Sequence, residues 1–198
     1  MDEALRRARV LVDSGFRVAI EHPRGNRFVE LIARVHAAGL APHCELTLPV
    51  DRLGEAEAIA LATRAGMAVA LTGRPEVVDA VVARVPDARV VVPAADHDAE
   101  ERCRALAFGR VRLTAGRGAA ADLAFVRCLN VLMAAGGTPA VATTDPRLVA
   151  VTGERAAWND RTPDSWEHVM PYGVRTDQQR RLVAAGYAVR VSIKDVTK

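Results

Sequence analysis

The sequence has 198 residues, of which 50% are hydrophobic and 26% are charged, with 14 glycines and 10 prolines. This composition is typical of a soluble globular protein and excludes a disordered, collagen-like or disulfide-stapled chain. We expect a single domain over residues 1–198, and no apolar run is long enough to span a bilayer. The N-terminal segment MDEALRRARV has no apolar signal core, so a cytoplasmic location is predicted.

The charge composition argues against a nucleic-acid partner. The net charge is +3 and the isoelectric point is about 9.0. The basic residues are almost all arginine, they are dispersed among 24 acidic residues, and only 4% of the chain is aromatic. Because no basic run carries interleaved aromatics, we predict that the protein does not bind nucleic acid.

The three cysteines, Cys44, Cys103 and Cys128, form no CxxC motif and have no histidine at ligand spacing. An odd and scattered set is typical of reduced thiols in the core of a protein from a reducing compartment.

Short β-rich runs alternate with longer helical patterns along the chain. After a helix over 2–14, strands are predicted at 16–20, 43–49, 67–71, 88–93, 110–113, 139–143, 166–170 and 187–193. Helices are predicted between them at about 26–38, 53–65, 75–84, 98–107, 119–135, 146–157 and 176–185. Glycines in VHAAGL, ATRAGM, MAAGGTP and VAAGYAV are expected to end helices in the left-handed conformation. Asp145-Pro146 and Thr176-Asp177 are expected to begin helices with a capping side chain.

Eight βα-type units predict an α/β protein with a compact (β/α)₈ TIM-type barrel. An open doubly wound sheet is the alternative, although no GxGxxG motif follows the first strand. The chain stops after the eighth strand, so the eighth helix is expected to be missing. The apolar face of 187–193 would then be uncovered unless the N-terminal helix or another subunit packs on it, which predicts self-association or a protein partner there.

Alternation along the strands places several charged side chains in the barrel lumen, namely Arg17, Glu45, Arg112, Glu167 and Arg190. Buried charges must pair, so a structural Arg–Glu network is favoured, with an anion-binding site as the alternative.

Active sites in this fold lie at the carboxyl ends of the strands. Among the residues there, Asp96-His97-Asp98 is interpreted as a helix start capped by Asp98 rather than as a metal site, and His22 has no second histidine at matching spacing. The segment TAGRGAAAD, residues 114–122, fits either a phosphate cradle using Arg117 or a plain βα turn. We predict no metal site.

Four segments in order, GRVRLTAGRG, FVRCLNVLM, TPAVATTDPRLV and WEHVMPYGVRTDQQRRLVAAGYAVRV, resemble the second half of bacterial monofunctional proline dehydrogenases. The resemblance covers about residues 103–193, and GLAPHCELTLPVDRLG and GMAVAL resemble earlier parts of that family. It implies a flavin-binding (β/α)₈ barrel that uses FAD to oxidise L-proline to 1-pyrroline-5-carboxylate.

Carried over residue by residue, the resemblance implies a catalytic role for Arg112 and a role in binding the cofactor for a further set of residues. That set is Thr72, Gly73, Ala115, Gly116, Arg117, Thr143 and Thr144. The chain departs from the polar residues of the family at Pro49, Thr72, Pro93, Ala115, Gly118, Thr144 and Val169, and it lacks the C-terminal helix whose arginines bind the substrate.

Three functions are therefore predicted. The favoured one is a degenerate relative that is not an efficient proline oxidase and that binds a proline-like metabolite or a partner. The alternatives are an active FAD-dependent oxidoreductase, and an activity completed by an oligomer or second polypeptide that supplies the arginine helix.

Overall fold

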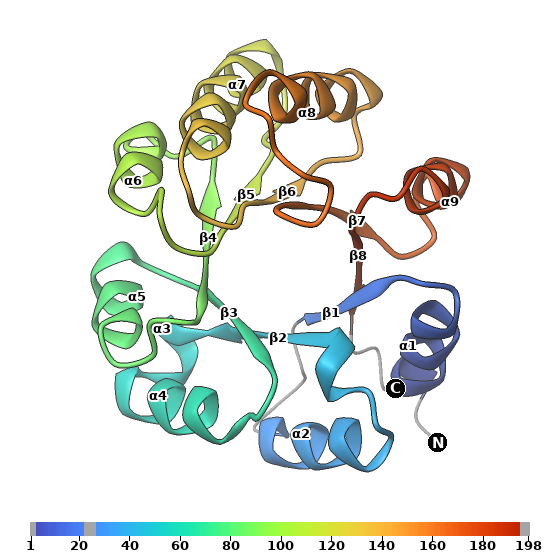
Figure 1. Ribbon diagram of the computed structural model, residues 1–198. Coiled ribbons are helices and arrows are strands. Elements are labelled where there is room, and N and C mark those ends of the chain that lie inside the picture. The colour runs from blue at the N-terminus through green and yellow to red at the C-terminus, as the bar shows by residue number, and fades with distance from the viewer. Residues whose placement is uncertain (1–2, 22–26, 195–198) are drawn as a thin grey trace. The chain divides into compact units, whose positions relative to one another are not determined.

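The computed structural model describes residues 3–21 and 27–194. Its eight strands follow one another around a closed barrel in the order β1 to β8, and every strand pair with a defined register is parallel (Figure 1). The predicted (β/α)₈ architecture is confirmed, and the open doubly wound sheet is excluded.

The chain divides into two compact units, and unit 1 comprises residues 1–89 and 190–198. Its elements are α1 (Glu3–Asp13), β1 (Arg17–Glu21), α2 (Phe28–Ala37), a 3₁₀-helix (Ala41–His43), β2 (Cys44–Pro49), α3 (Val50–Leu53), α4 (Glu55–Arg64), β3 (Ala68–Thr72), α5 (Pro75–Val82) and most of β8 (Val189–Lys194). The helices lie on one side of the strands (Figure 1). The side chains that strands turn toward this side are apolar and buried, as at Val18, Leu46 and Leu71.

Unit 2 comprises residues 90–189. Its elements are β4 (Arg89–Pro93), α6 (Ala99–Ala105), β5 (Val111–Thr114), α7 (Ala119–Ala134), β6 (Ala140–Ala142), α8 (Pro146–Trp158), β7 (Glu167–Pro171) and α9 (Thr176–Ala184). Here too the helices cover one side of the strands, where Val92, Leu113 and Met170 are buried. Both units therefore follow the period-two pattern of their strands, with the apolar set under the helices.

All eight strands and the eight predicted helices occur within a few residues of their expected bounds. The sequence pattern did not indicate α3 or the 3₁₀-helix, because four- and three-residue segments are too short to show a helical period.

The helix ends follow the predictions in part. Gly39, Gly66 and Gly186 have φ of 66°, 56° and 86°, as expected for glycines that end helices. The expectation is wrong at Gly136-Gly137, since neither has a positive φ. Gly137 is instead needed for close packing, because a Cβ there would lie 2.4 Å from the backbone oxygen of Gly109.

One of the two predicted helix caps is confirmed. The Asp145 carboxylate accepts a 2.8 Å hydrogen bond from the backbone N–H of Arg147 at the start of α8. The cap predicted at Thr176-Asp177 is wrong, because α9 already begins at Thr176 and its N-cap is Arg175, which makes no side-chain cap bond.

The apolar face of β8 is buried within the chain, which is one of the outcomes that the sequence left open. Val191 and Ile193 are 0% and 2% exposed. The N-terminal helix α1 packs on β1, the strand that pairs with β8, and buries Ala4, Leu5, Ala8 and Leu11. Self-association stays a prediction, but this face no longer supplies a reason for it.

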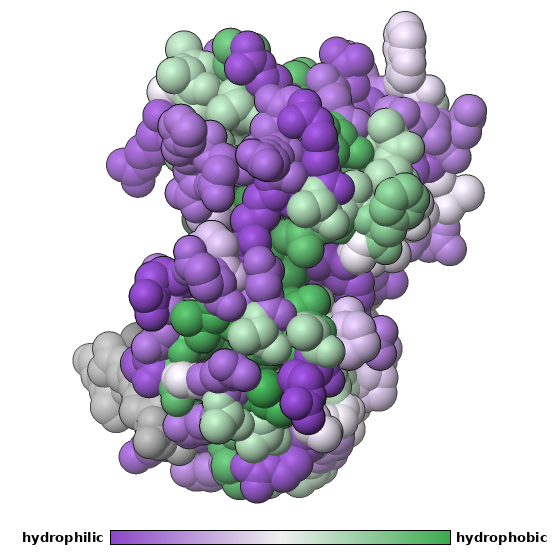
Figure 2. Space-filling model, turned by 90° about the vertical axis from the view of Figure 1, so that its left-hand side faces the viewer, coloured by the Kyte–Doolittle hydropathy of each residue, from purple (hydrophilic) through white to green (hydrophobic). Residues whose placement is uncertain are grey.

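In each unit, hydrophilic and hydrophobic residues are interspersed on the surface that Figure 2 shows. Within residues 3–21 and 27–194, no helix combines the length and the apolar character needed to cross a membrane.

Candidate functional site

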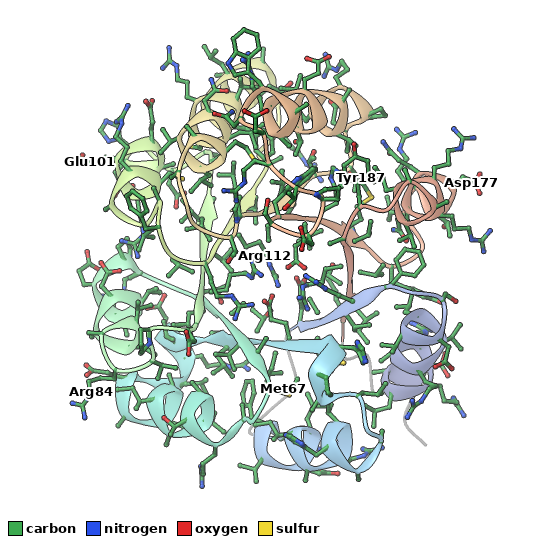
Figure 3. The ribbon with its side chains drawn as sticks, viewed as in Figure 1. Met67, Arg84, Glu101, Arg112, Asp177 and Tyr187 are labelled. Carbon is green, nitrogen blue, oxygen red and sulfur yellow. The ribbon has the colours of Figure 1, made fainter. Side chains whose placement is uncertain are left out.

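Arg112 lies in the middle of β5, on the side of the strand turned away from helices α6 and α7 (Figure 3). Its side chain is 3% exposed. In the strand register it lies between Val91 of β4 and Ala140 of β6, and Ala140 is followed by Glu167 of β7. The structure therefore confirms that Arg112 and Glu167 share the face of unit 2 that is turned away from the helices, and both are buried.

A second buried charge cluster lies within unit 1. Arg89 Nε donates a 2.8 Å hydrogen bond to Glu45 Oε2, and Arg190 Nε lies 4.0 Å from Glu45 Oε1. Arg190 also donates to the backbone oxygen of Val18 at 3.0 Å. Because Glu45 is 0% exposed and both arginines are under 6% exposed, this cluster fits the structural ion-pair network that was favoured.

The membership of this cluster differs from the prediction at two positions. Arg17 faces the same side as Arg190, its register partner, but it begins β1 and is exposed, so it is not a lumen charge. Arg89 was not expected, although the alternation of Arg89, Val91 and Pro93 along the predicted strand carries the signal that would have identified it.

The next row toward the carboxyl edge of unit 2 is poor in polar groups. Following the register from strand to strand, it consists of Pro93, Thr114, Ala142 and Val169. Only Thr114 offers a polar side chain, and Pro93 has no backbone N–H. This row lies directly above Arg112, where ligands bind in barrels of this type.

The β5–α7 turn carries three of the residues assigned to cofactor binding, Ala115, Gly116 and Arg117. The Ala115 N–H donates to Ala142 O at 3.0 Å, which ties this turn to β6. A Cβ at Gly116 would lie 2.8 Å from the Cβ of Ala121 and 3.1 Å from that of Ala95, so the turn is folded tightly on its own neighbours. Arg117 is exposed. Gly118, with φ of 91°, is the N-cap of α7 and has no side chain to satisfy the first-turn N–H groups.

Thr143 and Thr144 follow β6 and lie next to the residues that begin α8. Thr143 is buried and its hydroxyl oxygen accepts a 3.2 Å hydrogen bond from the Asp145 N–H. Arg147 contacts Asp145 at 2.7 Å and Asp122 of α7 at 3.5 Å. The hydrogen bonds from Arg147 hold the pKa of Asp145 at about 2, so this carboxyl is ionised at neutral pH.

The remaining two assigned residues, Thr72 and Gly73, belong to unit 1. Thr72 ends β3 and pairs in register with Pro49, which ends β2. Gly73 has φ of 148°, and a Cβ there would lie 2.7 Å from Val50 Cγ2. Asp51 accepts hydrogen bonds from the backbone N–H and Nε of Arg74 at 3.0 and 3.2 Å, which fastens the β3–α5 turn to α3.

Of the other sequence candidates, none forms a metal site in the described ranges, where no group of three metal-ligating side chains occurs. Asp98 does occupy the N-cap position of α6, but its side chain makes no capping hydrogen bond. His22 lies outside the described residues. A groove of about 500 Å³, not expected from the sequence, lies at the starts of α8 and α9 and is lined by Pro146, Arg175, Thr176, Asp177, Gln178 and Arg181.

Comparison with known proteins gives a local sequence similarity and a similarity of fold. No protein-family model matches the chain. A stretch of 72 residues is 32% identical to proline dehydrogenase 1 of Bacillus subtilis (strain 168), and it covers 36% of this chain and 24% of that protein.

Solved structures of proline utilization A have a similar fold. Proline utilization A from Bdellovibrio bacteriovorus, inactivated by N-propargylglycine, superposes with a TM-score of 0.77 over 98% of this chain and 30% of that chain, at 15% identity. A variant of proline utilization A from Bradyrhizobium japonicum gives 0.73 over 91% and 27%, at 16% identity.

The matches thus cover between 24% and 30% of the length of these relatives. The chain thus has the barrel fold of the proline utilization A structures and, over 72 residues, a sequence similarity to a proline dehydrogenase.

Proposed function

We propose that this protein binds a small proline-like metabolite through its carboxylate without oxidising proline efficiently. The observation that carries the proposal is the row Pro93, Thr114, Ala142 and Val169, which presents a single polar side chain directly above buried Arg112. A carboxylate needs a cation, best supplied by a guanidinium. Arg112 can supply this guanidinium, whereas the four residues above it offer few groups for catalysis. The arrangement therefore favours binding of a carboxylate over oxidation of the ligand.

The residues present do not fit the FAD that the resemblance implies. A flavin needs hydrogen-bond donors and acceptors around its ring and donors for its diphosphate. Pro93 and Ala142 offer no side-chain partner for a ring, and the Gly116 turn is filled by Ala121 and Ala95 rather than opened toward a ligand. Efficient oxidation also needs the substrate held against the acceptor in a fixed orientation, which one threonine and one arginine do not provide.

One observation favours the alternative, an active FAD-dependent oxidoreductase acting on proline or a related imino acid. The N-terminus of the 16-residue helix α7 has Gly118 as its cap and no side-chain cap bond. Its first-turn N–H groups are therefore available to a phosphate, with exposed Arg117 beside them. A flavin held through its diphosphate alone is the arrangement this alternative requires.

The two functions separate in one spectroscopic experiment. The purified protein is incubated with FAD, freed of unbound cofactor by gel filtration and scanned for a protein-bound flavin band, and L-proline is then added without oxygen. We expect no flavin that proline bleaches. A retained band that bleaches with proline would establish the alternative and overturn the proposal.

The binding half of the proposal has its own measurement. L-proline and its carboxylate analogues should raise the melting temperature of the wild-type protein, because a ligand that binds only the folded state stabilises it. In Arg112→Met the affinity should fall about tenfold or more. Arg84→Met, at an exposed arginine in the turn after α5 (Figure 3), should bind like the wild type. Equal affinities in the two variants would remove Arg112 from the site.

A further inference from the structure

Two of the three cysteines, which lie 25 positions apart in the sequence, meet inside unit 2. Cys103 lies on α6 and Cys128 on α7, helices that run side by side (Figure 1). Their thiols are joined by a hydrogen bond, and the side chains are 0% and 1% exposed. The third cysteine, Cys44, is buried in unit 1 and provides an internal comparison.

We propose that Cys103 and Cys128 form a reversible intramolecular disulfide when the protein meets a peroxide. The two buried side chains lie on adjacent helices and are hydrogen-bonded to each other, so each thiol is the other's neighbour before any oxidation occurs. A disulfide needs an S–S distance of about 2.05 Å, so its formation brings the two helices closer at this point. The proposal is independent of whether the barrel binds a metabolite.

The hydrogen bond gives the two thiols different roles. Cys103 donates to the Cys128 sulfur, which lowers the pKa of Cys128 and raises that of Cys103. Cys128 is therefore the thiol that ionises more readily of the two, and thiolates are the reactive form. Cys44 lacks such a donor, and burial raises its pKa to about 11.

The reaction balances with hydrogen peroxide as the oxidant. The Cys128 thiolate attacks one peroxide oxygen, the O–O bond breaks, and the second oxygen leaves as hydroxide that is protonated to water. The resulting sulfenic acid is attacked by Cys103, whose sulfur forms the S–S bond, and a second water leaves with the proton of that thiol. Two thiols are oxidised and one peroxide is reduced to two waters.

Access to the buried pair is provided by the weak anchoring of α6. This seven-residue helix buries only Ala99 and Cys103, both small, whereas α7 buries Phe125, Leu129, Leu132 and Met133 besides Cys128. A segment with so little buried apolar surface opens at low free-energy cost. Local opening of α6 therefore admits a molecule as small as peroxide.

The disulfide would enclose part of the candidate site. Residues 104–127, which lie between the two cysteines, contain β5 with Arg112 and the turn with Gly116 and Arg117. Closing this segment covalently restricts its freedom, so oxidation couples redox conditions to the part of the barrel that carries the buried arginine.

The test treats the reduced full-length protein with hydrogen peroxide under native conditions and follows it by intact-protein and peptide mass spectrometry. The protein should lose the mass of two hydrogen atoms and regain it with dithiothreitol. Trypsin should release the dipeptide Cys103-Arg104 linked to residues 128–147, since arginines lie at 102, 104, 127 and 147.

Two variants control the experiment. Cys44→Ser should give the same linked peptides at the same rate. Cys103→Ser should give none, and Cys128 should instead accumulate as a sulfenic acid that dimedone traps. Even if Cys103→Ser fails to fold, the peptide map of the unsubstituted protein decides the matter. A link that involves Cys44, a link between two chains, or three thiols that stay reduced until the protein is unfolded would each overturn the proposal.

Discussion

Neutralising Glu45 should destabilise the protein more than neutralising an exposed carboxylate does. Glu45 is 0% exposed and faces the guanidinium of Arg89 at 2.8 Å and that of Arg190 at 4.0 Å. Glu45→Gln keeps the shape of the side chain but removes the negative charge between two buried cations. Removing one partner of a buried ion pair costs about 3–5 kcal/mol.

The cost translates into a measurable shift of the melting temperature. For a chain of 198 residues the entropy of unfolding is about 0.4 kcal/mol/K, so Glu45→Gln should melt roughly 7–12 °C below the wild type. Differential scanning calorimetry at neutral pH provides the measurement. The double variant Glu45→Gln/Arg89→Met should lose less than the sum of the two single losses, because the second substitution removes one of the cations that the first leaves behind.

An exposed ion pair in the same unit provides the matched control. Glu30 lies 3.7 Å from Arg34 on α2, and both side chains are at least 40% exposed. Glu30→Gln should change the melting temperature by no more than about 1 °C, because water already screens this pair. If Glu45→Gln also melts within about 2 °C of the wild type, the buried ion pair between Glu45 and Arg89 does not contribute the stability that its burial implies.

Two further predictions concern unit 2. Burial lowers the pKa of His168 from 6.5 to about 4. Between these two pH values the imidazole is protonated in the unfolded chain but neutral in the folded chain. The free energy of unfolding should therefore fall by roughly 3 kcal/mol as the pH drops from 6.5 to 4. Urea unfolding at pH 7 and 4.5 measures this loss, and His168→Gln should reduce it; an unchanged pH dependence in the variant would show that other groups are responsible. Gly137→Ala places a Cβ 2.4 Å from Gly109 O and 2.5 Å from Ala107 O and should destabilise by about 1–3 kcal/mol. Gly153→Ala lies in the interior of α8, and apart from the adjoining helix backbone no atom lies within 4 Å of the new Cβ. It should stabilise by about 0.5–1 kcal/mol in the same urea assay. Effects of the same sign in the two variants would contradict this expectation.

Much of the candidate site could be anticipated because it follows from strand alternation. The pattern of Val111, Arg112 and Leu113 assigns Arg112 to the side away from the helices, and the structure places it there. Alternation also predicted a buried Arg17, and this prediction is wrong. Arg17 is the first residue of β1, where the face of the strand does not determine whether a side chain is buried. The cofactor-binding assignments of Thr72, Gly73, Ala115, Gly116, Arg117, Thr143 and Thr144 came from the family resemblance and stay predictions.

The sequence pattern did not predict which glycines are needed for close packing of the loops. Gly137 resembles a glycine that ends a helix, but it is required by the backbone of Ala107 and Gly109, about 30 residues earlier in the chain. Only the packed structure shows such an approach, because it depends on how two loops meet and not on the conformational preference of one residue.

The sequence by itself determined the eight strands, their buried faces and the barrel, because periodicity and helix-ending residues are local signals. Only the tertiary structure decided which side chains meet. Glu45 and Arg89 are 44 positions apart and Cys103 and Cys128 are 25 apart. Alternation assigns Glu45 and Arg89 to a face of their strands, but it does not tell which side chains meet there. The contacts depend on the register between strands and, for the cysteines, on the packing between helices, and both form only when the whole chain folds.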